Sequence, residues 1–140
     1  IQRIIEAASY KERIHGIWNC SWKAGIEHIR VEQEKGELPI NDLFFYFDPP
    51  FFEKADALYR FYFLHEDHAA LRDYLLALED KWILSYDAAG EIEELYGDAI
   101  HHKKNGTNRQ HVEIYYTLAK MPERKASKEV IISNIPELPS

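Results

Sequence analysis

The chain of 140 residues has one cysteine, one methionine and only six glycines, none of which stands next to another. Since Cys20 has no second cysteine to pair with, an internal disulfide and a four-cysteine zinc site are excluded. No apolar run approaches the roughly 20 residues that a membrane-spanning helix needs. We therefore expect a protein of a reducing compartment, the cytoplasm by default, that folds as a single domain over residues 1–140.

Positive charge is also scarce, and it is unevenly distributed along the chain. The formal net charge is −7 at neutral pH. Residues 1–100 hold ten Lys and Arg against twenty Asp and Glu, whereas residues 101–128 hold seven against two. An acidic body does not attract nucleic acid, because phosphate binding depends on a local excess of Lys and Arg. The basic segment is either a solvated hairpin or a loop that faces phosphates, and its composition leaves both open.

Apolar residues make up 46% of the chain, and their spacing alternates between that of helices and that of short strands. This spacing predicts helices over residues 1–13, 22–34, 65–78 and 88–96, and strands over residues 14–20, 43–47, 81–86, 112–119 and 129–133. Because strands and helices alternate, strands 43–47 and 81–86 are expected to be parallel neighbours. The unbroken apolar run of the first predicts burial on both faces. The expected class is a three-layer α/β domain, with helices on the faces of the sheet and a C-terminal antiparallel hairpin.

Two of the predicted strands end at polar residues, which is where ligands bind in an open parallel sheet. One ends at Asp48-Pro49-Pro50-Phe51 and the other at Ser85-Tyr86-Asp87, so the two segments are expected to line one cleft. The Asp48 carboxylate and the Pro49 carbonyl are acceptors, and together they suit an NH₂ group. Phe51 is placed to stack on a planar heterocycle. The alternative is a turn that does no more than end the strand.

The seven histidines raise the question of a metal site. His65 and His68 are three residues apart, and His101 and His102 are adjacent. A zinc site needs three or four ligands within tetrahedral reach, and the sequence lacks the helical His-Glu-x-x-His pattern. We therefore expect no metal.

The order of motifs along the chain resembles that of one enzyme family. A strand that ends in Asp-Pro-Pro-Phe is followed by an aromatic segment at 58–63, an acidic helix start at 65–68 and a second strand, KWILSYD. Glu94-Leu95-Tyr96 and an Asn-Gly segment at 105–109 come later. From about Arg13 to Asn134, the chain is similar in this order to the catalytic half of Dam-like adenine-N6 DNA methyltransferases.

The resemblance implies a partial Rossmann-like methyltransferase sheet and a site-specific enzyme. Its reaction would transfer a methyl group from S-adenosylmethionine to the exocyclic N6 of adenine in DNA. Asp48 and Pro49 would accept hydrogen bonds from the target amine, with Pro50 and Phe51 completing the catalytic motif. The Phe51 ring would stack on the base after it is flipped out of the duplex.

The resemblance also assigns residues to the cofactor and to DNA. Cofactor contacts would come from Ser21, Trp22 and Asp48, although a place in the core suits Trp22 equally well. The DNA contacts would come from a tyrosine of the aromatic segment and from the basic Asn-Gly segment, namely Tyr59, Lys103, Lys104, Asn105 and Arg109. The basic residues among them would bind phosphates, which gives affinity but little sequence preference.

Two parts of the family pattern are not found in this sequence: the glycine-containing loop that holds the methionine part of the cofactor, and the target-recognition insertion. We therefore expect the C-terminal half of a methyltransferase catalytic domain, whose partner is the missing N-terminal half. Such a fragment would be inactive and would self-associate through an unpaired sheet edge. Two other interpretations stay open: an RNA or protein-amide methylase with the same acceptor motif, and a catalytically dead module for DNA binding or subunit contact.

Overall fold

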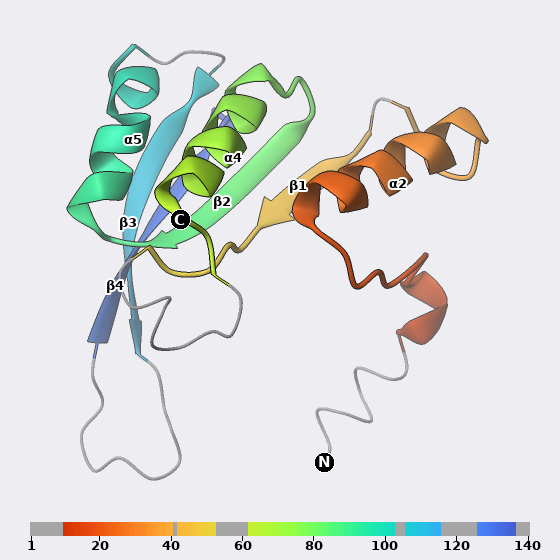
Figure 1. The fold of residues 1–140 in the computed structure, drawn as a ribbon, viewed down its shortest axis with the longest axis horizontal. Helices are drawn as coiled ribbons and strands as arrows, with labels where there is room; N and C mark the ends of the chain where they lie inside the picture. The colour runs from red at the N-terminus through yellow and green to blue at the C-terminus, as the bar shows by residue number, and fades with distance from the viewer. Residues whose placement is uncertain (1–9, 41, 53–61, 103–105, 116–125, 137–140) are drawn as a thin grey trace, which may run out of the picture. The chain divides into compact units, whose positions relative to one another are not determined.

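The computed structural model describes residues 10–40, 42–52, 62–102, 106–115 and 126–136 (Figure 1). The contacts within the chain divide it into two compact units, Ile1–Ile40 and Asn41–Ser140. The element order is a short 3₁₀ helix and an α-helix in the first unit, then an alternation of strands and helices in the second.

The first unit is built around helix α2, Trp22–Glu34, whose bounds agree with the predicted helix 22–34. The helix begins after Ser21, whose Oγ accepts a hydrogen bond from the backbone N–H of Ala24 at 3.3 Å. Such a cap satisfies one of the backbone donors that every helix leaves open in its first turn. The helix ends before Gly36, whose φ of +78° is the left-handed conformation that favours glycine after a helix.

The prediction of a strand over residues 14–20 is wrong. The segment has no strand pairing, and the apolar side chain of Ile17 is 87% exposed. Its contacts are with α2 instead: the Trp18 ring stacks on His28 with centroids 5.8 Å apart, and His15 Nε2 lies 3.3 Å from a Glu32 carboxylate oxygen. A strand needs a neighbour to accept its backbone hydrogen bonds, and no strand lies among the described residues of this unit.

Of the helix predicted over residues 1–13, the structure describes only the last part. Lys11–Arg13 forms the short 3₁₀ helix η1, with no buried residue. The rest of that prediction lies outside the described residues. A three-residue turn of this kind is a connector and contributes little stability of its own.

The second unit contains a four-stranded mixed sheet with the order β1-β2-β4-β3. The strands are β1, Phe44–Phe47; β2, Lys81–Asp87; β3, Asn108–Tyr115; and β4, Ala126–Ser133. Strands β1 and β2 are parallel neighbours, which confirms that prediction, and Phe47 pairs with Leu84. Strands β3 and β4 form the predicted antiparallel hairpin, although β3 begins at Asn108 rather than at residue 112. Residues 116–119 of the predicted strand lie outside the described part.

Two helices, α4 (His65–Ala77) and α5 (Gly90–His101), lie on the same face of this sheet (Figure 1). Among the described residues of the second unit there are thus two layers, a sheet and one layer of helices, and not the three that were predicted. Helix α4 confirms the prediction for residues 65–78 to within one residue. Helix α5 extends five residues beyond the predicted end at residue 96, because its next turn places Ala99 in the core. The core between sheet and helices consists of large buried side chains, chiefly Leu71, Leu75, Ile92, Tyr96, Trp82, Leu84, Tyr86, Val130 and Ile132.

The prediction that strand 43–47 is buried on both faces is also wrong. Phe45 is buried, whereas Phe44 and Tyr46 are 55% and 61% exposed. Successive side chains of a strand point to opposite faces, and both helices of the unit lie on the Phe45 side, where Trp82, its partner on β2, is buried as well. An unbroken apolar run indicates a strand, but it does not show how many of its faces are covered.

Candidate functional site

The carboxyl ends of β1 and β2 meet, as the parallel arrangement predicts. After β1 the chain turns through residues 48–52, called here the 48–52 turn. Ser85 Oγ lies 3.0 Å from Asp48 Oδ1, and the backbone N–H of Phe52 donates to Asp87 Oδ1 at 2.8 Å. Two side chains of β2 therefore hold the turn at its first and last residues.

The turn presents acceptors to solvent. Asp48 is exposed, while Pro49, Pro50 and Phe51 are half-buried. A proline offers a carbonyl and no N–H, and an ionised carboxylate only accepts hydrogen bonds. The local chemistry of this turn therefore favours a ligand rich in donors, such as an amine or amide NH₂ group.

A buried histidine and a buried tyrosine lie next to Phe52, the last residue of the turn, and the sequence did not predict that these two side chains pair. His68 of α4 and Tyr86 of β2 are each 2% exposed, and His68 Nδ1 is 2.7 Å from the Tyr86 hydroxyl. The rings of Phe52 and Phe63 contact His68, with centroids 4.8 and 5.2 Å away. The apolar spacing places His68 on a helix but carries no signal that its side chain faces β2.

Burial changes the ionisation of this pair. Removal from water disfavours a charged imidazole and so lowers the pKa of His68, an effect that the carboxylates of Asp67 and Asp87 partly oppose. The same burial raises the pKa of the Tyr86 hydroxyl. Both groups are therefore neutral near pH 7. They are joined by a neutral hydrogen bond, and the His68 ring packs against Phe52 at the end of the 48–52 turn.

Two of the three predicted cofactor residues, Ser21 and Trp22, lie in the first unit, at the start of α2, whereas the third, Asp48, lies in the 48–52 turn of the second unit. The Ser21 hydroxyl serves as the helix cap, and the half-buried Trp22 ring lies 5.3 Å from the Lys23 ammonium. The structure thus gives both residues a role in their own helix. Their assignment to a cofactor stays a prediction.

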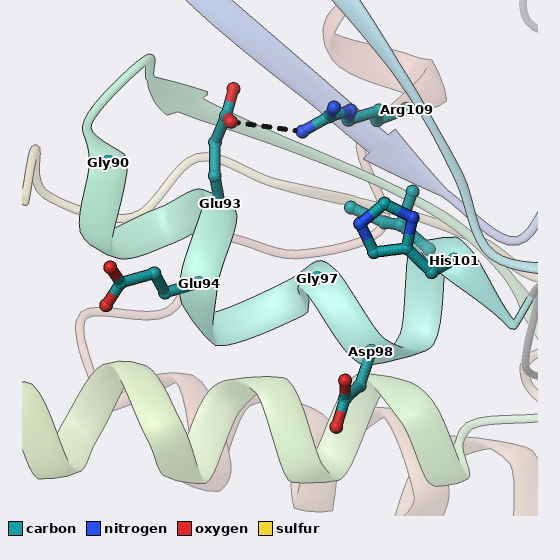
Figure 2. Close-up of a pocket in the computed structure, with 8 residues that line it drawn as sticks. Gly90, Glu93, Glu94, Gly97, Asp98, His101 and Arg109 are labelled. Atoms are coloured by element: carbon teal, nitrogen blue, oxygen red, sulfur yellow. Dashed lines mark ion pairs between the residues drawn. The ribbon is translucent and has the colours of Figure 1, made fainter.

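Of the predicted DNA contacts, only Arg109 is described; Tyr59, Lys103, Lys104 and Asn105 lie outside the described residues. Arg109 Nη1 lies 3.3 Å from Glu93 Oε2, and His111 Nε2 lies 3.2 Å from the other oxygen of the same carboxylate. Figure 2 shows the ion pair between α5 and β3. The charge of Arg109 is therefore offset by an acid, and its role toward phosphate stays a prediction.

An open hollow of about 500 Å³ lies beside α5 and is lined by residues of this helix and by Arg109 of β3 (Figure 2). Its walls carry the carboxylates Glu93, Glu94 and Asp98, and two glycines leave part of it without side chains. No residue of the 48–52 turn lines it. Carboxylates outnumber the one guanidinium there, so the hollow does not suit a phosphate group.

Neither a metal site nor a membrane-spanning helix is found among the described residues. Among the residues that the structure describes, no three His, Cys, Asp or Glu side chains gather closely enough to hold a metal ion. Within the same ranges, no helix has both the length and the apolar character needed to cross a bilayer.

Comparisons with the known protein families and with curated proteins found no match for this chain. The strongest local arrangement is the 48–52 turn, with its exposed acceptor and its two anchors on β2.

Proposed function

We propose that the chain is the part of an S-adenosylmethionine-dependent enzyme that receives the target base, and that this enzyme methylates the exocyclic N6 of adenine in DNA. The observation that carries this proposal is the hydrogen bond from β2 to Asp48, which holds an exposed carboxylate at the carboxyl end of a parallel strand. Ligands bind at that edge in open α/β sheets. The four-stranded sheet would then be one half of a Rossmann-like methyltransferase sheet.

The residues of the turn suit this reaction. The second Asp48 oxygen and the Pro49 carbonyl would each accept one hydrogen of the adenine NH₂, which directs the nitrogen lone pair away from the protein. The Phe51 ring would stack on the flipped base, an interaction that contributes about 1–3 kcal/mol in nucleic-acid sites. The amine nitrogen would take the methyl group as the bond from that methyl to sulfur breaks, and the sulfur would keep the electron pair of the broken bond. The Asp48 carboxylate would disperse the positive charge that develops on nitrogen, and the proton that nitrogen then gives up would pass to water.

S-adenosylmethionine supplies an electrophilic methyl group when it is bound. In this chain, the half-buried Trp22 indole would pack against the face of its adenine, and the Ser21 hydroxyl, whose oxygen caps α2, would keep its hydrogen for an acceptor of the cofactor. Cys20, the residue that precedes Ser21, is an exposed free cysteine. A reducing compartment such as the cytoplasm would keep its thiol reduced.

The test is transfer of labelled methyl from S-adenosylmethionine to nucleic acid by the full protein. Three substrates are compared: duplex DNA of random sequence, the same DNA with every adenine already N6-methylated, and RNA of the same sequence. We expect label only on the first, recovered as N6-methyladenine after digestion. Transfer to the pre-methylated duplex or to no substrate would contradict the proposal.

Two other results separate the remaining interpretations: the substrate that receives the label, and the binding of the cofactor measured by calorimetry. Label on RNA, or on a peptide containing Asn and Gln offered in a parallel reaction, would change the substrate class and keep the chemistry. Calorimetric titration with S-adenosylmethionine distinguishes an enzyme from a dead binding module. DNA binding without any cofactor binding would favour the dead module.

A further inference from the structure

Ser85 and Tyr46 are the two side chains around Asp48 to which the proposed function gives no role. Ser85 Oγ is 3.0 Å from Asp48 Oδ1, and the Tyr46 hydroxyl is 3.0 Å from Ser85 Oγ. Ser85 is only 4% exposed, whereas the Tyr46 ring is 61% exposed. A largely exposed ring is not there to fill the core, so the hydrogen bond of its hydroxyl is its notable contact.

The strand register explains why these three residues meet. Tyr46 and Asp48 are two residues apart, so they project from the same face of the extended chain. Phe47 pairs with Leu84 on β2, and the next position on each strand brings Asp48 beside Ser85. The contact is thus set by the sheet and not by a flexible loop.

The direction of the hydrogen bonds follows from the chemistry of the groups. An ionised carboxylate has only acceptor sites, so Ser85 must donate its single hydroxyl hydrogen to Asp48 Oδ1. The Ser85 oxygen then accepts from the Tyr46 hydroxyl. Hydrogen-bond donation therefore runs from Tyr46 to Ser85 and from Ser85 to Asp48. In the described part of the chain, Asp48 Oδ2 has no protein partner.

We infer that Ser85, supported by Tyr46, is a positioning residue that fixes the Asp48 carboxylate and leaves its Oδ2 for the donor of the ligand. This inference rests on the proposed function, in which Asp48 receives the target amine. A fixed acceptor lowers the cost of bringing the amine into the reactive geometry. Ser85 acts through Asp48 and touches no substrate, so its loss slows turnover more than it weakens binding.

Three single variants and one double variant test by kinetics the hydrogen-bond chain from Tyr46 through Ser85 to Asp48, called here the relay. Ser85→Ala removes the donor to a charged group, which is expected to lower kcat about 10- to 100-fold while the KM for S-adenosylmethionine stays within about threefold. Ser85→Thr restores the hydroxyl and recovers most of kcat. Tyr46→Phe removes a neutral hydrogen bond and lowers kcat about 2- to 10-fold. In the Ser85→Ala background, Tyr46→Phe has no further effect, because the relay is already broken.

Two control variants remove comparable hydroxyls elsewhere. Ser133→Ala deletes a buried serine hydroxyl on β4 that accepts from the Ile135 N–H at 2.8 Å, and Tyr10→Phe deletes an exposed phenol of the first unit. Both leave kcat unchanged. Equal losses of kcat in Ser133→Ala and Ser85→Ala, with matching losses of thermal stability, would overturn the positioning role.

A second readout does not depend on catalysis. In protein labelled with ¹³C at aspartate carboxyls, Ser85→Ala and Tyr46→Phe shift the Asp48 resonance, and Ser133→Ala does not; Asp48→Asn assigns the signal. An unmoved Asp48 resonance in Ser85→Ala would overturn the relay. A wild-type protein that shows the relay by this measurement but transfers no methyl group would instead overturn the proposed function, and with it the catalytic meaning of the relay.

Discussion

At the scale of single residues, two polar side chains of one strand decide the geometry of the candidate site. Ser85 holds the side chain of Asp48, and Asp87 holds the backbone of Phe52. Both anchors come from the last three residues of β2. A charged or polar group at the end of a buried strand is costly unless it is paired, and here each pairing also shapes the turn.

Asp48→Ala is expected to reduce methyl transfer by at least about 10- to 100-fold, because a hydrogen bond to a charged acceptor is removed where the target amine is oriented. The affinity for S-adenosylmethionine, measured by calorimetry, should stay within a few-fold, since the proposed function gives the carboxylate the target amine to orient and not the methyl donor. Asp48→Asn is the matched control: it keeps an acceptor for Ser85 but removes the charge. Near-normal turnover in Asp48→Ala would remove Asp48 from the mechanism.

The stability of the fold should depend on pH through His68, whose pKa is lowered by burial. Between the unfolded pKa of about 6.5 and the lower folded pKa, the unfolded chain binds more protons than the folded one. The contribution of neutral His68 is therefore complete above about pH 6.5 and is lost as the pH falls toward the folded pKa.

Urea unfolding from pH 7.5 down to pH 5 measures this loss. His68→Asn keeps a group near Nδ1 for Tyr86 but does not titrate, so its stability, although lower at pH 7.5, should fall less over the same interval. If both proteins lost stability in parallel, other groups would govern the acid response.

At the scale of elements, Ser21 at the start of α2 has an observed role as a helix cap and a proposed role in cofactor binding. The family resemblance assigns Ser21 to the cofactor, and the structure shows its hydroxyl capping the helix. A capping side chain can stabilise a helix and still donate its hydrogen to a ligand. The two roles differ in what a substitution changes.

Ser21→Ala should destabilise the start of α2 by about 1 kcal/mol, the usual cost of losing a helix cap. Amide hydrogen exchange at Ala24 and its neighbours measures this change directly. Ser21→Asp restores the cap and serves as the control, because its carboxylate accepts from the same N–H but offers no hydrogen. If cofactor affinity falls equally in both variants, the hydroxyl hydrogen serves the cofactor; unchanged affinity in both would leave Ser21 a capping residue alone.

At the scale of the whole molecule, the acidic balance of the chain conflicts with a DNA substrate. Positive charge is concentrated after residue 100, and within the described residues of that segment Arg109 is already paired with Glu93. Both partners are partly exposed, with side chains 34% and 41% accessible, so their attraction is weak and a phosphate could compete for the guanidinium.

Replacing Lys103, Lys104 and Arg109 with Gln should weaken DNA binding equally for all sequences. The slope of log K against log salt should become shallower by up to about 0.9 for each phosphate that the protein no longer neutralises. Fluorescence anisotropy at several salt concentrations measures both effects. Glu93→Gln is the opposing variant: it releases Arg109 and should raise affinity by no more than about fivefold. An unchanged salt slope in the triple variant would make the segment a solvated hairpin.

The sequence by itself determined the elements and much of their order. The bounds of α2, the helix at 65–78 and the parallel pairing of β1 with β2 follow from local properties: the spacing of apolar residues, the caps, and the glycine or prolines that end an element. The meeting of Asp48 with the end of β2 also followed, since adjacent parallel strands end at one edge.

Only the tertiary structure decided which faces are covered and which polar atoms pair. Residues 14–20 have strand-like composition but pair with no strand in the described part of their unit. Tyr46 is exposed because the described helices of its unit lie on the opposite face. The bonds from Ser85 to Asp48 and from Arg109 to Glu93 join residues from different elements. Such pairings depend on strand register and helix placement, which are properties of the folded chain and leave no local pattern in the sequence.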